Sequence, residues 1–141
     1  MRAQDLMVGD WVQDHGTPYM VEEISAKGWI HLSDPVHHTR VQMASDYILD
    51  EVDGIPLTAE IFEANGFTRS KAFVEWKYED DDIYMLWNPF PWIKIQHEDK
   101  NVMFPCEFVH ELQHAMRLCG IDGTEYEIEV RVKTKKEGRE Q

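Results

Sequence analysis

Residues 105–120 have the sequence PCEFVHELQHAMRLCG, the clearest helical pattern in the chain. At 3.6 residues per turn, one side of this helix collects the apolar side chains Phe108, Val109, Leu112, Ala115, Met116 and Cys119. The opposite side carries His110, His114 and Arg117, so we expect these three to face solvent. Pro105 suits a first turn, and Gly120 suits a left-handed helix end. The stretch therefore predicts a core helix for the second half of the chain.

The same helix contains a possible metal motif. His110, Glu111 and His114 match H-E-x-x-H, in which two histidines one turn apart bind zinc and the glutamate activates water. The longer pattern, which adds a glycine and a third histidine, fails because Arg117 and Gly120 occupy those two positions. On the predicted wheel both histidines point outward, which favours a purely structural helix over a zinc site.

A catalytic zinc also needs a third protein ligand. The candidates nearest in sequence are His97, Glu98, Asp122 and Glu125, and none stands at a recognisable spacing. We therefore predict no metal, no cofactor and no catalytic residue. A small zinc-dependent hydrolase that uses His110, Glu111 and His114 stays open as the alternative.

Composition indicates a folded protein with an acidic surface. The chain has 141 residues, 43% of them hydrophobic, and a net charge of −13 from 27 acidic and 14 basic residues. Such a charge argues against binding to nucleic-acid phosphates, which need a basic surface. It leaves open a basic partner, and also an acidic decoy that mimics DNA and occupies a DNA-binding protein.

The two cysteines and the hydrophobic runs bear on the compartment. Cys106 and Cys119 are 13 residues apart on one predicted helix, too far to form a disulfide, so they are expected to be reduced thiols. No run is long enough to cross a membrane, and the N-terminus has no apolar signal core. These observations predict a cytoplasmic protein.

The first 53 residues predict short strands joined by turns. Strands are expected around Trp11-Val12 and over 19–24, 29–32, 36–43 and 47–52, with a turn at 15–18. Short strands at this spacing are typical of a small antiparallel barrel of SH3-like type. His31, His37 and His38 fall in this part, and we assign them to a solvated loop or edge because adjacent histidines on a strand point to opposite sides.

After Asp53-Gly54 the pattern changes to an α+β domain over 54–133. Thr58 is a natural N-cap for a short helix over 59–65. Strands are expected over 73–78, 83–87, 92–96, 102–104 and 126–133, and residues 134–141 form a charged tail.

Two stretches of this domain have a second interpretation. The acidic run 79–82 could supply oxygens to calcium, but it lacks the spacing of a calcium loop, so we predict a solvated hairpin tip. Pro89 and Pro91, with Trp87, Phe90 and Trp92, could form an exposed aromatic surface for a partner. Core packing is the default for aromatic residues at strand spacing.

Three motifs together resemble a family of small uncharacterised proteins of Bacteroidetes bacteria and their prophages and mobile elements. The first is RAQDLMVGDWV at 2–12, and the second is IPLT at 55–58 with NGF at 65–67. The third is a V-H-x-L-Q helix at 109–113 that continues to Leu118 and Gly120. In that family, position 111 is often glutamine and position 114 often asparagine, which implies that H-E-x-x-H arose here by two substitutions on a structural helix. The family has no established activity.

These observations lead to one reading of the chain. It is an α+β protein with an N-terminal small antiparallel SH3-like β-barrel (1–53), followed by an antiparallel sheet with two helices. Its predicted function is that of a non-enzymatic interaction or accessory protein of a prophage or mobile element. It would bind an unknown protein partner and would bind neither nucleic acid nor membrane, and its oligomeric state is left open.

Overall fold

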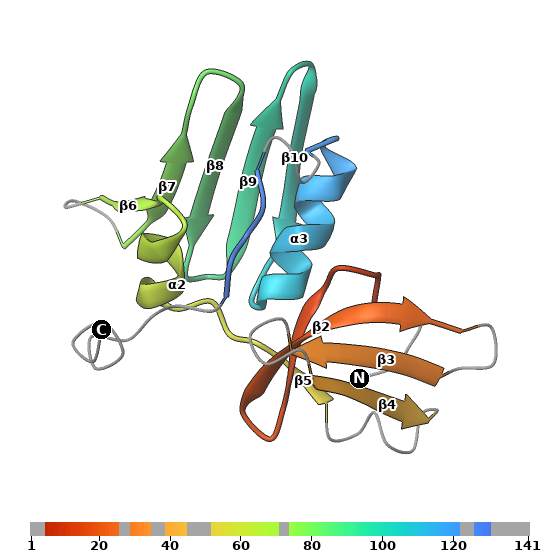
Figure 1. Cartoon of the computed structure of the whole chain (residues 1–141). Coiled ribbons are helices and arrows are strands. Elements are labelled where there is room, and N and C mark those ends of the chain that lie inside the picture. The colour runs from red at the N-terminus through yellow and green to blue at the C-terminus, as the bar shows by residue number, and fades with distance from the viewer. Residues whose placement is uncertain are drawn as a thin grey trace. The chain divides into compact units, whose positions relative to one another are not determined.

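The structure, a computed structural model, describes residues 5–25, 29–34, 39–44, 52–70, 74–121 and 126–130. The chain divides into two compact units, each with its own sheet (Figure 1). The first unit consists of Met1–Pro56 with Phe108–Gln113, and the second of Leu57–Glu107 with His114–Gln141. The predicted first domain ended at residue 53, whereas the first unit extends to Pro56 and takes in a later segment.

The expected α+β class is confirmed. The described residues contain two five-stranded antiparallel sheets and two helices. The first sheet has the order β4-β3-β2-β1-β5, and its strands are β1 (Trp11–Asp14), β2 (Thr17–Ile24), β3 (Trp29–Asp34), β4 (Thr39–Ala44) and β5 (Val52–Gly54). In the described residues this sheet is open, with β4 and β5 at its edges, rather than a closed barrel. The expected positions 36–38, with His37 and His38, and 45–51 lie outside the described residues.

The turn between β1 and β2 is shorter than predicted. His15 and Gly16 both have positive φ, 52° and 82°, as a two-residue hairpin turn of type I′ requires. Thr17 and Pro18 therefore already belong to β2, where they pair with Asp14 and Gln13.

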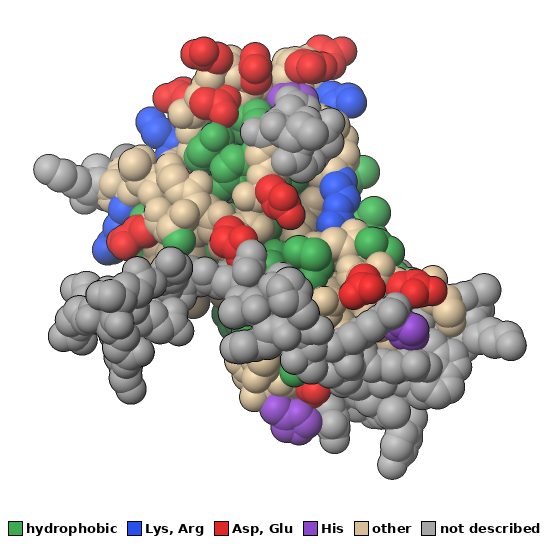
Figure 2. Space-filling model, viewed as in Figure 1, with side chains coloured by type: hydrophobic (Ala, Val, Ile, Leu, Met, Phe, Trp, Pro, Cys, Tyr) green, Lys and Arg blue, Asp and Glu red, His purple; other side chains and the backbone are tan. Residues whose placement is uncertain are grey.

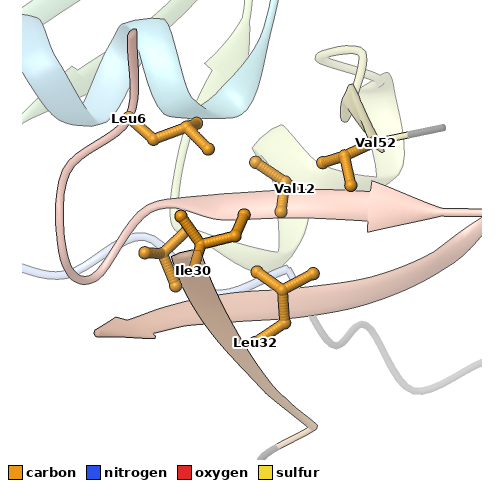
Figure 3. Close-up of a cluster of buried hydrophobic side chains, with 6 residues drawn as sticks. Leu6, Val12, Ile30, Leu32 and Val52 are labelled. Carbon is orange, nitrogen blue, oxygen red and sulfur yellow. The ribbon is translucent and has the colours of Figure 1, made fainter. Parts of the chain in front are cut away.

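The core of the first unit comes from alternating positions of its strands. Fully or nearly fully buried aliphatic side chains meet there: Leu6, Val12, Val21, Ile30, Leu32 and Val52. Figure 3 shows Leu6, Val12, Ile30, Leu32 and Val52 pointing toward one another from the segment before β1 and from β1, β3 and β5. A register shift between Val21 and Glu23 marks a bulge in β2, which increases the local bend of that strand.

The second sheet has the order β10-β9-β8-β7-β6. Its strands are β6 (Thr68–Arg69), β7 (Trp76–Glu79), β8 (Ile83–Asn88), β9 (Trp92–His97) and β10 (Lys100–Pro105). All four longer strands were predicted, although β7 begins at Trp76 instead of residue 73 and β10 begins at Lys100 instead of residue 102. The two-residue strand β6 was not predicted, because its residues carry no alternating pattern of their own.

One face of the second sheet is covered by the helix α2 (Ala59–Ala64), by the segment 126–130 and by the last turns of the helix α3 (Val109–Leu118), as Figure 1 shows. Phe62 of α2 stacks on Trp76, with ring centroids 5.5 Å apart, and also contacts Trp87. Cys119 donates its thiol to the carbonyl oxygen of Ile95. The predicted N-cap of α2 is confirmed, since Thr58 Oγ1 accepts a hydrogen bond from the Ile61 amide.

The prediction of a last strand over 126–133 is wrong for residues 126–130, the part of it that the structure describes. This segment is not part of a sheet. Its alternation holds, because Ile128 and Val130 are buried and Glu127 is exposed. The predicted tail at 134–141 lies outside the described residues. Among the described residues, no helix has the length and apolar character that a membrane crossing requires.

Candidate functional site

The helix α3 is held at both ends by its own sequence. At the start, Glu111 Oε1 accepts a hydrogen bond from the Phe108 amide at 3.0 Å, the glutamate half of a capping box. At the end, Gly120 has φ 76°, and the amides of Gly120 and Ile121 donate to the carbonyls of Arg117 and Met116. This pair of bonds is the Schellman arrangement that a terminal glycine allows, so the predicted helix end is confirmed. The predicted start is wrong, because Pro105 is the last residue of β10 and α3 begins at Val109.

The expectation that both histidines face solvent is wrong for His110. Its side chain is only 8% exposed, and its ring stacks on Phe108 with centroids 5.9 Å apart. Gly54 of β5 provides the room, because a Cβ added there would lie 2.6 Å from Phe108 Cγ and 3.0 Å from His110 Cε1. His114 and Arg117 are partly exposed.

The reason is that the first turns of α3 are buried on a second side. Gln113 is also buried: its Oε1 accepts from the Trp11 amide and its Nε2 donates to the Gly9 carbonyl oxygen, each at 2.8 Å. A helical wheel identifies a single apolar stripe, whereas contacts on a second side of the helix bury polar residues that the wheel assigns to solvent.

The H-E-x-x-H residues do not gather a third ligand in the described part of the chain. There, no group of three His, Cys, Asp or Glu side chains is arranged to hold a metal. Among the four candidates, His97 has its Nδ1 2.7 Å from the carbonyl oxygen of Cys119, and Glu98 occupies a turn with φ 56°. Asp122 and Glu125 lie outside the described residues.

A second cluster of titratable groups lies at the tips of the β7–β8 and β9–β10 hairpins. Figure 2 shows the acidic side chains gathered at this end of the sheet. They border a shallow depression of about 270 Å³ lined by residues 79–84 and 96–98. Asp80 is used by the turn itself: its Oδ1 accepts from the amides of Asp82 and Ile83, and its Oδ2 accepts from the Tyr78 hydroxyl. The backbone hydrogen bonds lower the pKa of Asp80.

The strongest candidate for a binding surface is the face of the second sheet opposite the helices. We call it the outer face, and it consists of the alternate residues of β8, β9 and β10 that lie across from one another in three rows. They are Asn88, Trp92 and Pro105; Leu86, Lys94 and Met103; and Tyr84, Gln96 and Asn101. Their neighbours Ile93 and Ile95 are fully buried on the covered side.

Large apolar side chains on this face are exposed. Trp92 is 41% exposed and Met103 59% exposed, and Phe90, in the turn between β8 and β9, is 82% exposed. Core packing was the default expectation for these aromatic residues. It is right for Trp87, whose ring contacts Phe62 and whose Nε1 donates to the Cys106 carbonyl oxygen, and wrong for Phe90 and Trp92.

Lys94 stands in the middle row of the outer face, between Leu86 and Met103. No carboxylate forms an ion pair with it within the described residues. The outer face therefore combines exposed apolar area with one cationic group, on a chain whose net charge is −13. Comparison with family models, with curated proteins and with solved structures finds no match for this chain.

Proposed function

We propose that this protein is a non-enzymatic binding protein that contacts a partner protein through its outer face. The observation that carries the proposal is the exposure of Trp92 and Met103 on one sheet face, with Phe90 in the adjoining turn. Tryptophan, phenylalanine and methionine are enriched in the buried centres of protein interfaces. Exposing them together in water forfeits the burial of apolar area, which is worth about 25 cal/mol per Å².

The chemistry of the partner follows from the residues around Lys94. A partner surface that fits would carry apolar side chains against Trp92 and Met103 and a carboxylate within reach of the Lys94 ammonium group. An opposite charge of this kind contributes chiefly to the rate of association and to the choice of partner. The acidic hairpin tips lie at the other end of the same strands. They would repel a partner that carries negative charge at that end.

The role of Glu111 supports a non-enzymatic function. A zinc peptidase uses this glutamate beside the metal-bound water, whereas here its carboxylate accepts the Phe108 amide. The helix cap thus accounts for Glu111 without any chemistry. Zinc-dependent hydrolysis by His110, Glu111 and His114 remains the alternative.

We also propose the genetic setting, the cellular location and the barrel fold that the sequence suggests. The resemblance to Bacteroidetes proteins supports a role in a prophage or mobile element, and the cysteine usage supports a cytoplasmic location. The order β4-β3-β2-β1-β5, in which the last strand pairs with the first, supports an SH3-like barrel for residues 1–53. The bulge in β2 bends the strand in the way that a small barrel needs.

The test is affinity capture with the full-length protein from a lysate of the bacterium that encodes it. The bait is compared with Trp92→Asp and with Val74→Asp, a matched control that places the same charge at a 56% exposed position outside the outer face. We expect one protein to bind the native bait and the control but not Trp92→Asp.

Three results would contradict this function. Capture that is equal for the native bait and both variants would exclude the outer face. Recovery chiefly of DNA-binding proteins that added duplex DNA releases would favour the acidic decoy. One tightly held zinc per chain, with a peptidase activity that Glu111→Gln abolishes, would favour the hydrolase.

A further inference from the structure

The edge of the second sheet at β10 is long and carries little charge. β10 (Lys100–Pro105) lies at one end of the strand order, and the other end is β6, which has only two residues. Proteins usually blunt an exposed edge with charges, bulges, prolines or very short strands. In β10 the charge and the proline stand at the two ends, and the four central residues, Asn101 to Phe104, are uncharged.

The pairing of β10 with β9 determines which backbone groups point outward. His97 pairs with Lys100 across a two-residue turn, so this pair exchanges hydrogen bonds. Bonded and non-bonded pairs alternate in an antiparallel ladder. Val102 and Phe104 therefore direct their backbone groups to β9, whereas Asn101 and Met103 direct their N–H and C=O groups to the open edge. Both of these residues are exposed, Met103 by 59%.

We propose that two copies of this protein pair β10 with β10 in antiparallel orientation, about a two-fold axis at Val102. In this register, Asn101 of each copy lies opposite Met103 of the second copy, and both pairs exchange backbone hydrogen bonds. The product is a continuous ten-stranded sheet. A two-fold dimer of identical chains is the commonest symmetric assembly of soluble proteins, and this one satisfies the outward backbone groups of both edges.

The charges of β10 favour a second copy of this protein as the strand that pairs with the open edge. Although 27 of the 141 residues are acidic, Lys100–Pro105 contains no carboxylate. Lys100 lies opposite Phe104 of the second copy, so no like charges face each other across the new ladder. The Lys100 ammonium is also directed to the end of its own α3: its Nζ lies 3.0 Å from the position of a Cβ on Gly120. The nearest acidic residues in sequence, Asp99 and Glu107, lie beyond the two ends of the paired strand rather than within it.

This dimer uses the strand edge and does not rest on the outer-face partner. It would bring the Met103 side chains of both copies together on one continuous outer face. The two proposals are distinguishable, because Trp92→Asp alters the outer face without touching the backbone groups at the edge.

The first experiment measures the mass of the full-length protein in solution by light scattering over a hundredfold range of concentration. We expect a dimer for the native protein and for Met103→Leu. Met103→Pro removes only an outward N–H group, a change that an edge strand tolerates, and it should give a monomer with an unchanged circular dichroism spectrum. A native protein that stays monomeric at all concentrations overturns the proposal.

The second experiment tests the register and does not depend on the proline variant. At the axis, the two Val102 Cα atoms form a non-hydrogen-bonded pair about 4.5 Å apart, within reach of a disulfide. The two Met103 Cα atoms are separated by about 8 Å, which is too far. Under mild oxidation, Val102→Cys should form covalent dimers at least tenfold faster than Met103→Cys, although position 103 is the more exposed. Equal or faster cross-linking through position 103 overturns the two-fold axis.

Discussion

The Asn65 side chain forms two hydrogen bonds with the backbone of Glu129, as a neighbouring strand would. Its Nδ2 donates to the Glu129 carbonyl oxygen at 2.7 Å, and its Oδ1 accepts the Glu129 amide at 2.6 Å. The same Nδ2 also donates to Ile61 at the end of α2, and the Tyr126 hydroxyl donates to the Asn65 carbonyl oxygen. One side chain thus fixes the segment 126–130, which brings the buried Ile128 and Val130 onto the sheet.

We expect Asn65→Ala to lower the free energy of unfolding by about 2–4 kcal/mol, because both backbone groups of Glu129 lose a partner in a partly buried place. The measurement is urea denaturation, and Glu63→Ala, at an exposed position of α2, is the control with an expected change within about 0.5 kcal/mol. Equal effects of the two changes would show that residues 126–130 are held by their apolar side chains alone.

Tyr126 predicts a pH dependence. Burial, with Tyr78 as a second cause, raises the pKa of Tyr126 far above its ordinary value of 10.0. The folded state therefore keeps this proton when the unfolded state has lost it, so the contribution of Tyr126 to stability is fully present below pH 10 and falls as the pH rises further. Denaturation at pH 9 and pH 11 measures the fall.

The variant Tyr126→Phe separates the contribution of the Tyr126 hydrogen bond from that of its ionisation. It should be less stable at pH 7 by about 1 kcal/mol, since the hydrogen bond to Asn65 is lost, and it should lose less stability between pH 9 and pH 11 than the native protein. A native stability that rises over this interval would contradict the burial of the Tyr126 hydroxyl.

The two histidines of α3 should differ in their effect on stability. His110→Ala removes a buried ring that stacks on Phe108, and we expect a loss of about 1–3 kcal/mol. His114→Ala, at a partly exposed position on the same helix, should change stability by less than about 0.5 kcal/mol. Leu112→Ala, as a fully buried leucine, should cost about 2–5 kcal/mol. Thermal unfolding of the three variants ranks them, and a larger loss for His114→Ala than for His110→Ala would reverse the assignment.

Glu111 should behave as a helix cap. Glu111→Ala is expected to cost about 1 kcal/mol, whereas Glu111→Gln, which retains an oxygen acceptor for the Phe108 amide, should be nearly neutral. Zinc content after dialysis against trace zinc is measured on the same samples. Retention of one zinc per chain by both the native protein and Glu111→Gln, together with a peptidase activity that only the native protein shows, would mean that the carboxylate acts in a metal site.

The outer face offers the remaining prediction. Because Lys94 has apolar neighbours on both sides, Lys94→Glu should weaken capture of the partner at least tenfold and leave stability nearly unchanged, as expected for a surface substitution. Arg69→Glu, an exposed position on β6 opposite the buried Trp76 and therefore not on the outer face, is the matched control and should bind normally. Loss of binding in both variants would indicate a response to net charge rather than to Lys94.

Local sequence determined the elements of this protein. The spacing of apolar residues predicts α3, Gly120 ends it, Thr58 begins α2, and alternation predicts β7 to β10 as well as the burial of Ile128 and Val130. These features depend on residues within one or two turns of each other, so their energies can be read from a short window.

Only the tertiary structure decided the rest. The burial of His110 depends on the space left by Gly54, 56 positions earlier. Residues 126–130 are held by Asn65 rather than by a strand. Trp92 is exposed because the helices and residues 126–130 cover the opposite face of the sheet. Each of these outcomes is set by contacts between residues far apart in the chain, which no periodicity in a short window encodes.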